Sequence, residues 1–212
     1  MPLVFKGGTY LWFFHGLRRF SEDLDFTASE ESSKDIPEMV SRSLALFGVV
    51  NELKRIKDNN TTFSFRITAN GPLNSGLRDR CVVYVEISKR EMVLCKTIPV
   101  KFDRPEYQLP IKNLSGMALE EVGAEKVRAI MTRDKARDIY DLYYLIHNKK
   151  IKFDNKLTVQ KLKYYKTGFS KLKLIEKIND SNDYYKKELT TIVLEDIPDY
   201  KFVRTTIDDW IL

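Results

Sequence analysis

The sequence predicts an α+β fold in which a mixed twisted sheet with flanking helices is followed by an all-helical C-terminal half. Short apolar runs that alternate every two residues, as strands do, occur up to about residue 102, whereas the pattern is helical from Leu114 onward. Hydrophobic residues make up 43% and charged residues 31% of the 212 residues, a balance that allows a buried core. We therefore expect a mixed core over residues 1–112 and a helical region over residues 113–212 packed on it.

Strands and helices alternate in the first half of the chain. We expect strands at Leu3–Phe5, Asp23–Thr27, Thr62–Ile67, Cys81–Ile87 and Val93–Phe102, and helices at Thr9–Leu17 and Ile36–Leu53. The strongest strand signal is CVVYVEI, in which valines and an isoleucine alternate with Tyr84 and Glu86. The polar segment Ser29–Lys34 and the turn-rich segment Asn70–Gly76 are expected to be loops.

The second half shows apolar residues at helical spacing. We expect helices at Leu119–Met131, Lys135–His147, Val159–Tyr165, Phe169–Ile178 and Tyr184–Leu194. Asp134 is the expected N-cap of the second helix, because an Asp side chain can accept hydrogen bonds from the first free backbone N–H groups.

The composition argues against several classes of protein. Cys81 and Cys95 form no CxxC pair and are expected to be reduced thiols in the core, and the isolated His15 and His147 argue against a histidine-based zinc site. No apolar run approaches the length of a membrane span and the start lacks the features of a signal peptide, so we expect a cytoplasmic protein without a membrane partner. The net charge of +6 suits nucleotides or RNA, although many other proteins are equally basic.

Two alternating carboxylates close the segment FKGGTYLWFFHGLRRFSEDLDF. Residues two apart in a strand share a face about 6.5–7 Å apart, so Asp23 and Asp25 can direct their oxygens at one cation or at two close together. Mg²⁺ commonly takes one or two carboxylates together with phosphate oxygens, and a cation would relieve the repulsion between the two acids. The alternative is a pair of solvated acids on an exposed strand edge.

A glycine turn lies between the first predicted strand and the first predicted helix. Backbone N–H groups at Gly7 and Gly8 can bind phosphate at the helix N-terminus, and Thr9 adds a hydroxyl donor. Most Gly-Gly pairs are simple turns, but a strand, GGT, a helix and a strand-borne Asp-x-Asp in close succession are less expected by chance. Glu86 could complete a carboxylate triad, and orient or deprotonate an attacking hydroxyl, if its strand neighbours that of Asp25; otherwise it is a solvated strand residue.

A second group of charged residues lies on the first two helices of the second half. Lys126 could reach phosphate oxygens as a mobile cation, with Arg133 beside it. Arg137 and Asp141 are spaced i,i+4 and are expected to pair on one helix face, with Asp138 pointing elsewhere. The alternative is a set of surface salt bridges that contribute little individually.

These motifs resemble those of the nucleotidyltransferases of the DNA polymerase β superfamily, in which a GG or GS, a helix and an acid-hydrophobic-acid-hydrophobic strand precede a third acid. More narrowly, FKGGTYL…GLRRFSEDLDF looks like the AbiEii/AbiGii toxin family, relatives of the MenT toxins, and the segment from Ala124 to Tyr143 resembles that family's second signature. The resemblance covers about residues 4–147. One departure is the early first strand, since members usually carry one or two helices before it.

The resemblance implies a polymerase β-like core and an Mg²⁺-dependent enzyme with a two-ion site. It implies metal binding by Asp23 and Asp25, NTP binding by Gly7, Gly8, Thr9, Lys126 and Arg133, catalysis by Asp23, Asp25, Glu86 and Lys126, and a positioning network of Arg137, Asp138 and Asp141. It further implies the toxin of a toxin–antitoxin or phage-defence (abortive infection) system, with a cognate antitoxin. The acceptor would be RNA, such as the tRNA acceptor end, or a protein hydroxyl.

Two other functions fit the same residues. The net charge and the Lys- and Tyr-rich residues 151–212 suggest a catalytically silent nucleotide- or RNA-binding module, although the intact Asp-x-Asp argues against it. Metal-dependent phosphodiester hydrolysis would release a nucleoside monophosphate from NTP instead of pyrophosphate. The identity of the NTP, the acceptor and the antitoxin, the oligomeric state and the role of residues 151–212 are left open.

Overall fold

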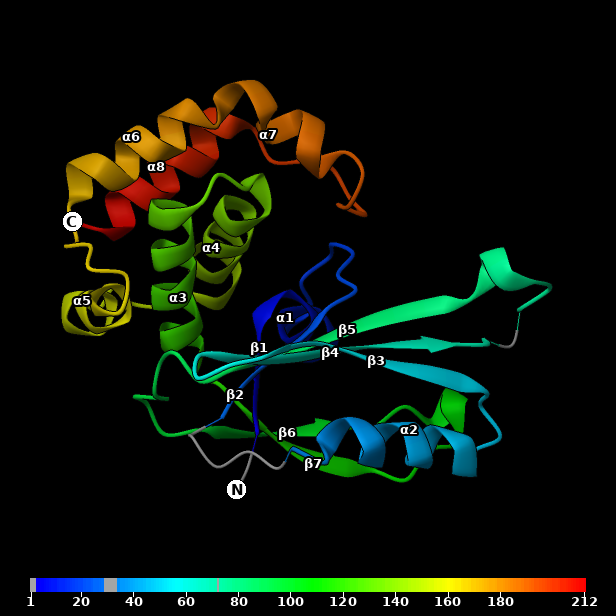
Figure 1. Ribbon diagram of the computed structural model, residues 1–212. Coiled ribbons are helices and arrows are strands. Elements are labelled where there is room, and N and C mark those ends of the chain that lie inside the picture. The colour runs from blue at the N-terminus through cyan, green and yellow to red at the C-terminus, as the bar shows by residue number, and fades with distance from the viewer. Residues whose placement is uncertain (1–2, 29–33, 72) are drawn as a thin grey trace.

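A mixed sheet with helices on both sides forms the frame of the protein (Figure 1). The computed structural model describes residues 3–28, 34–71 and 73–212, and within them seven strands form one sheet in the order β3-β4-β5-β2-β1-β7-β6. The strands are β1 Val4–Lys6, β2 Leu24–Thr27, β3 Asn51–Asp58, β4 Thr62–Ala69, β5 Cys81–Ser88, β6 Ile98–Phe102 and β7 Lys112–Gly116. Strand β2 pairs antiparallel with β1 and parallel with β5, and β1 pairs parallel with β7, which confirms the predicted mixed sheet.

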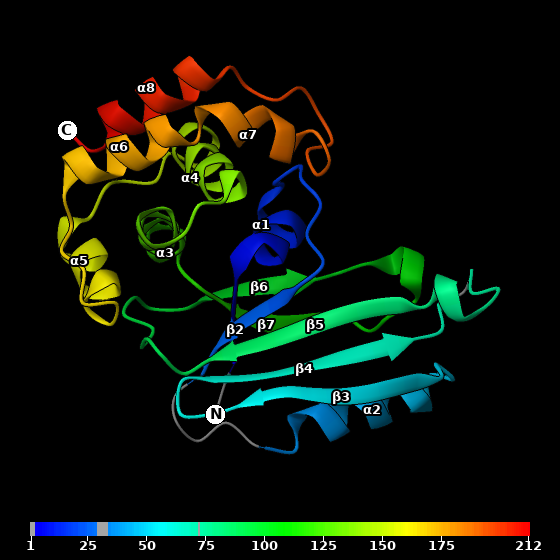
Figure 2. The ribbon, with the colours of Figure 1, turned by 45° about the horizontal axis from the view of Figure 1, so that its top comes forward.

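The helices are divided unequally between the two sides of the sheet. They are α1 Gly7–His15, α2 Ile36–Leu46, α3 Leu119–Thr132, α4 Ala136–Lys149, α5 Asn155–Lys163, α6 Lys171–Asp180, α7 Asn182–Leu189 and α8 Tyr200–Trp210, with short 3₁₀ turns η1 Leu77–Asp79 and η2 Pro105–Tyr107. Helix α2 lies on one side, and α1 with the helical second half lies on the other (Figures 1 and 2). Within the described residues, no helix is long and apolar enough to cross a membrane.

Two apolar cores follow from this arrangement. The larger one joins β1, α1 and the C-terminal helices, where Tyr10, Leu142 and Ile207 are fully buried. In the smaller one, α2 covers the side chains Phe65 and Ile87 of β4 and β5. Strands β4 and β5 therefore direct every second residue toward α2 and the intervening residues to the other side of the sheet.

Several predicted boundaries were wrong. The helix predicted over Ile36–Leu53 ends at Leu46, because Gly48 adopts a positive φ of 74° and the chain then enters β3. Strand β3 was missed because it is a mostly exposed strand at the edge of the sheet, which carries little hydrophobic alternation. The N-cap of α4 is Lys135 instead of Asp134, whose carboxylate pairs with Lys177 at 2.9 Å.

Other differences concern the second half of the chain. Strand β7 was not predicted; it begins at Lys112 and pairs with β1, so it belongs to the sheet of the first half. The expected division after residue 112 stays a prediction. The helix predicted over Tyr184–Leu194 is the shorter α7, and α8 was missed. The loop predicted over Ser29–Lys34 lies, apart from Lys34, outside the described residues.

Candidate active site

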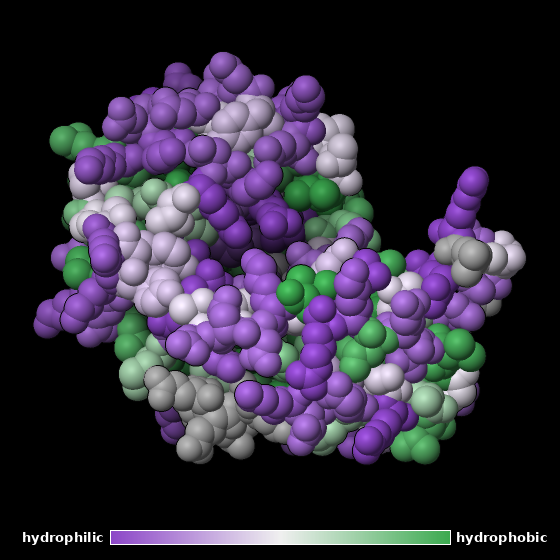
Figure 3. All heavy atoms as spheres, in the orientation of Figure 1, coloured by the Kyte–Doolittle hydropathy of each residue, from purple (hydrophilic) through white to green (hydrophobic). Residues whose placement is uncertain are grey.

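A cavity of about 350 Å³ opens between the sheet and helices α3 and α4. Figure 3 shows a hollow lined by hydrophilic residues between the helical part and the sheet. Among the described residues, its charged lining consists of Lys6, Asp23, Asp25, Glu86, Arg90, Glu125, Lys126, Arg128, Arg133 and Arg137. A deep hollow with this composition suits a ligand that carries several negative charges and is bound together with a cation.

Three charged residues form a row across three adjacent strands. Lys6 of β1 lies opposite Asp25 of β2, and Asp25 lies opposite Glu86 of β5. Residues opposite one another in a sheet project to the same side, and all three line the cavity. Asp23, just before β2, lines the same cavity. The three acids predicted from the sequence therefore line one cavity, and β2 and β5 are neighbours, which was the condition for Glu86 to join the other two.

Gly7 and Gly8 are the first two residues of α1, and side chains from other segments approach both of them closely. Gly7 has a φ of +79°, and a Cβ at this position would collide with the Asp25 carboxylate. A Cβ at Gly8 would collide with the guanidinium of Arg19 and the hydroxyl of Ser21. Both positions thus require a residue without a side chain, because charged and polar groups approach the backbone closely.

Thr9 holds the segment that carries the first acid. Its side-chain hydroxyl is buried and donates a hydrogen bond to the backbone carbonyl of Asp23 at 2.6 Å. Gly7 lines the cavity, whereas Gly8 and Thr9 are buried in α1. The structure thus gives Thr9 a contact that fixes the position of Asp23, and its predicted contact with phosphate stays a prediction.

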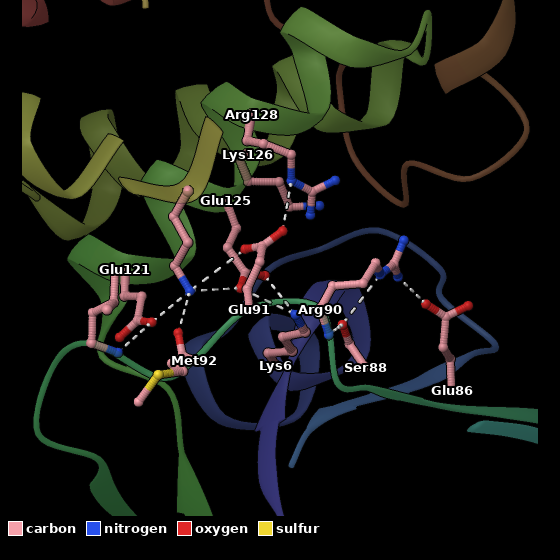
Figure 4. A network of polar contacts seen from close by, with 12 residues as sticks. Lys6, Glu86, Ser88, Arg90, Glu91, Met92, Glu121, Glu125, Lys126 and Arg128 are labelled. Carbon is pink, nitrogen blue, oxygen red and sulfur yellow. Dashed lines mark hydrogen bonds and ion pairs between the residues drawn. The ribbon is translucent and has the colours of Figure 1, made fainter. Parts of the chain in front are cut away.

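Asp25 carries a charge that its surroundings do not fully balance. Burial is the largest influence on Asp25 and raises its pKa; Lys6 and Lys126 oppose this rise, and the smaller repulsion from Glu86 and Asp23 adds to it. The Nζ of Lys6 is held by Glu125 instead, at 2.9 Å from one carboxylate oxygen (Figure 4). A cation placed beside Asp25 would therefore be strongly attracted.

The donor atoms suit a hard divalent cation. Within the described part of the chain, no three His, Cys, Asp or Glu side chains are grouped as metal ligands, and Glu86 accepts a hydrogen bond from Arg90 at 2.5 Å (Figure 4). Asp23 and Asp25 nevertheless supply carboxylate oxygens to one cavity, and Mg²⁺ needs only one or two of these beside phosphate oxygens and water. The residues therefore fit a cation that binds together with a phosphorylated ligand.

A buried ion network lies behind the opposite wall of the cavity, to which it contributes Lys126 and Arg133. Asp141 accepts hydrogen bonds from Arg19 at 2.5 and 2.7 Å and pairs with Lys126 at 2.7 Å. Lys126 also binds Asp138 at 2.9 Å, and Asp138 receives Arg133 at 2.7 Å. This network connects the segment before β2 with α3 and α4, so it fixes the helical half over the sheet.

The network corrects two expectations. Lys126 is only 8% exposed and is bound by two carboxylates, so it is a fixed cation and not a mobile one. The expected i,i+4 pair of Arg137 with Asp141 does not form, because Arg19 and Lys126 occupy the carboxylate of Asp141. Arg137 lines the cavity and makes no ion pair with any described residue.

The acids of this wall are ionised at neutral pH. Burial alone would raise the pKa of Asp141, but Arg19 and Lys126 together outweigh it and hold the pKa below its usual value. The pKa of Asp138 is lowered in the same way by Lys126 and Arg133. Burial would lower the pKa of Lys126, yet the two carboxylates raise it, so the ammonium stays charged.

A second buried network, partly drawn in Figure 4, was not predicted from the sequence. Glu125 of α3 receives Lys6 and, at 3.1 Å, Lys161 of α5, and Lys161 also binds Glu121 at 2.6 Å. Burial opposes ionisation of Glu125, but these lysines lower its pKa to about 2. The i,i+4 spacing of Glu121 and Glu125 was a visible signal, whereas nothing local in the sequence indicates that Lys161 meets them.

Sequence reasoning also missed Arg19 and Lys6. Arg19 is 2% exposed and binds an acid 122 positions away, so its partner is visible only in the tertiary structure. Lys6 is a charged residue that ends an apolar strand, and its position two residues after Val4 could have placed it on the face of the acids.

The comparisons with known proteins agree with this geometry. The family described as the nucleotidyl transferase AbiEii toxin of type IV toxin–antitoxin systems matches residues 1–209. The chain belongs to this family, and it is a nucleotidyltransferase toxin. The family implies an NTP substrate and an antitoxin partner. No curated protein sequence matches the chain.

Two solved structures share the fold over almost the whole chain. MenT4, a nucleotidyltransferase toxin from Mycobacterium tuberculosis H37Rv, has a TM-score of 0.67 at 20% identity, covering 98% of this chain and 73% of that chain. JHP933 from Helicobacter pylori has a TM-score of 0.62 at 21% identity, covering 99% of this chain and 82% of that chain. At these identities the likeness establishes the fold.

Proposed function

We propose that the protein is an Mg²⁺-dependent enzyme that transfers a nucleoside monophosphate from NTP to a hydroxyl of RNA, such as the tRNA acceptor end, and that a cognate antitoxin restrains it in the cell. The observation that carries this proposal is the row of Lys6, Asp25 and Glu86, with Asp23 beside it, facing a wall of cations across one cavity. Acids on one side and cations on the other suit a metal-bound triphosphate.

The two walls would divide the work of the reaction. The acceptor oxygen forms a bond to the α-phosphorus, the bond from that phosphorus to the β-phosphate oxygen breaks, and pyrophosphate leaves. Glu86 would orient the acceptor hydroxyl and take its proton, directly or through water, once Arg90 has released it. Asp23 and Asp25 would hold Mg²⁺, which when bound neutralises charge on the phosphates.

The cations of α3 and α4 would bind the triphosphate. Arg137 is the best candidate, because it lines the cavity and none of the described acids neutralises it. Arg133 lines the cavity too, and its side chain is 47% exposed although Asp138 binds it. Lys126, held by Asp138 and Asp141, would contribute a fixed positive charge. The backbone at Gly7 lies on the other side of the cavity, close to Asp25.

Substitution of the two metal-binding acids tests the proposal. Asp23→Asn and Asp25→Asn are expected to abolish transfer of α-labelled nucleotide to total RNA while the fold is retained, because each removes a charge that binds the cation. Asp183→Asn, at an exposed position in the first turn of α7, removes the same charge far from the cavity and should leave transfer unchanged. Undiminished transfer by both cavity variants would overturn the proposal.

The products separate this proposal from its alternatives. Pyrophosphate release with label retained on RNA indicates nucleotidyl transfer, whereas nucleoside monophosphate without labelled RNA indicates hydrolysis. A catalytically silent module would bind NTP or RNA without either product. Label recovered on protein and not on RNA would identify a protein hydroxyl as the acceptor.

A further inference from the structure

The cavity side of the sheet continues outward from the acids as an open surface. On this side Ser64 of β4 lies opposite Glu86, and one step further out Arg66 lies opposite both Tyr84 of β5 and Lys54 of β3. Figures 1 and 2 show that, of the described segments, the helical half covers the sheet near β1 and β2 and leaves the outer parts of β3, β4 and β5 bare on this side. Helix α2 occupies the opposite face.

This surface, formed by Lys54, Arg66, Tyr84 and Val82, combines an exposed aromatic ring with cations that lack partners. Tyr84 is 44% exposed and Val82, two residues before it in β5, is 40% exposed. Neither Lys54 nor Arg66 forms an ion pair with a described residue, and the Nε of Arg66 is buried without a hydrogen-bond partner. Proteins that bind single-stranded nucleic acid without sequence preference combine the same two features, because bases stack on aromatic rings and cations bind the phosphates.

The geometry of the reaction places the acceptor on this side. The attacking and leaving oxygens lie roughly in line through the α-phosphorus, so the acceptor approaches opposite the pyrophosphate. If Arg133 and Arg137 on the helical wall hold the leaving phosphates, the acceptor enters over the sheet, beside Glu86. Tyr84 lies two residues from Glu86 along β5, about 7 Å away, so a base stacked on it would belong to a nucleotide close to the reacting one.

We infer that the surface of Lys54, Arg66, Tyr84 and Val82 binds the single-stranded end of the RNA acceptor. Tyr84 stacks on a base near the reacting hydroxyl, Val82 extends the apolar floor beneath it, and Lys54 and Arg66 bind the phosphates that follow. This assignment rests on the proposed transfer to RNA, but binding of RNA to the surface can be measured without any transfer.

The test measures the affinity of the full chain for a fluorescein-labelled single-stranded oligoribonucleotide with a free 3′-hydroxyl, by anisotropy. Tyr84→Ala is expected to weaken binding by about 5- to 150-fold, which corresponds to 1–3 kcal/mol per stacked base, and Tyr84→Phe should restore it because the ring is retained. Lys54→Gln should lower the slope of log K against log salt by about 0.7, the value for one phosphate contact on a single strand.

Matched variants outside the surface provide the controls. Tyr164→Ala removes a tyrosine that is 46% exposed, and Lys187→Gln removes an exposed lysine of α7, and neither should change RNA affinity. In transfer assays Tyr84→Ala should raise the KM for RNA while the Kd for NTP, measured by calorimetry, stays the same. Thermal unfolding of each variant verifies that it is folded.

The outcomes distinguish this inference from the proposed function. RNA affinity unchanged in Tyr84→Ala, or lost equally in Tyr84→Phe and Tyr164→Ala, would overturn the surface assignment even if transfer to RNA is observed. Loss of antitoxin binding with unchanged RNA binding would identify a protein interface and would also overturn it. Conversely, the proposed function fails if Asp25→Asn still transfers nucleotide, and that result leaves the RNA affinities of the Tyr84 variants unaffected.

Discussion

Carboxylates on the two sides of the cavity differ in whether the protein itself neutralises them. Asp138 and Asp141 on the helical wall are fully buried, and arginine and lysine side chains occupy their oxygens. On the sheet wall, Asp25 has a raised pKa because burial and neighbouring acids outweigh its cations. Carboxylates whose oxygens are all bound by arginine and lysine side chains stabilise the fold. Carboxylates without enough cationic partners remain available to bind a ligand.

Lys6 shows how this difference is maintained. It lies opposite Asp25 in the sheet and is the natural partner for it, but its ammonium is held by Glu125. Glu125 is itself shared with Lys161, so the second network draws Lys6 away from the sheet acids. A cation delivered with the substrate is therefore still attracted to the cavity.

The largest expected effect on stability comes from breaking the helical network. Arg19→Gln leaves Asp141 with Lys126 alone and should lower the free energy of unfolding by about 3–5 kcal/mol, because a buried charge loses its bidentate partner. Its neighbour Arg18, with a side chain 71% exposed and 3.7 Å from Glu195, provides the control. Arg18→Gln should cost less than about 1 kcal/mol in the same denaturant titration. Equal effects of the two variants would contradict the division of roles between the walls.

The next effect concerns a cation that the network does not use. Arg137→Gln is expected to raise the KM for NTP by about 10- to 150-fold, the equivalent of one charged hydrogen bond of 1.5–3 kcal/mol, with little change in stability. Lys126→Gln should impair both NTP binding and stability, because Lys126 also neutralises Asp138 and Asp141. If Arg137→Gln destabilised the fold as much as Lys126→Gln, Arg137 would belong to the network after all.

The smallest expected effect is a gain in stability, which we expect from substitution of Asp25. A raised pKa means that the stability contributed by this group is present below the usual carboxyl pKa and is lost as pH rises through the raised value. Asp25→Asn should therefore raise the melting temperature near neutral pH, and the gain should shrink toward pH 4 or so, where Asp25 is protonated. Added Mg²⁺ should raise the melting temperature of the parent protein more than that of this variant. A lower melting temperature of Asp25→Asn near neutral pH would contradict the raised pKa.

The network acids should respond to pH in the opposite direction. Because the pKa values of Glu125, Asp138 and Asp141 are lowered, their stabilisation is present above the usual carboxyl pKa and is lost as pH falls through the lowered values. Acid should therefore destabilise the protein by protonating the network carboxylates, whereas protonation of Asp25 removes an unfavourable buried charge.

The sequence by itself determined the elements that carry the chemistry. The β2 motif DLDF, the valine-rich β5 and the helix pair α3 and α4 were recognisable because alternation and helical spacing are local properties of a chain. The spacing of Asp23 and Asp25 and the glycine turn also indicated a phosphate and metal site. The resemblance to a toxin family, carried by two short motifs, agrees with the family to which the chain belongs.

Only the tertiary structure decided how the charges are shared. The strand order placed Glu86 beside Asp25. The folded chain also brought Arg19 to Asp141 and Lys6 to Glu125, although more than 100 positions separate the members of each pair. The edge strand β3 and the late β7 were missed for the same reason, since their exposed faces carry little hydrophobic signal and pairing alone defines them. An ion pair has no periodicity along the sequence, so which acids are neutralised and which remain available follows from packing alone.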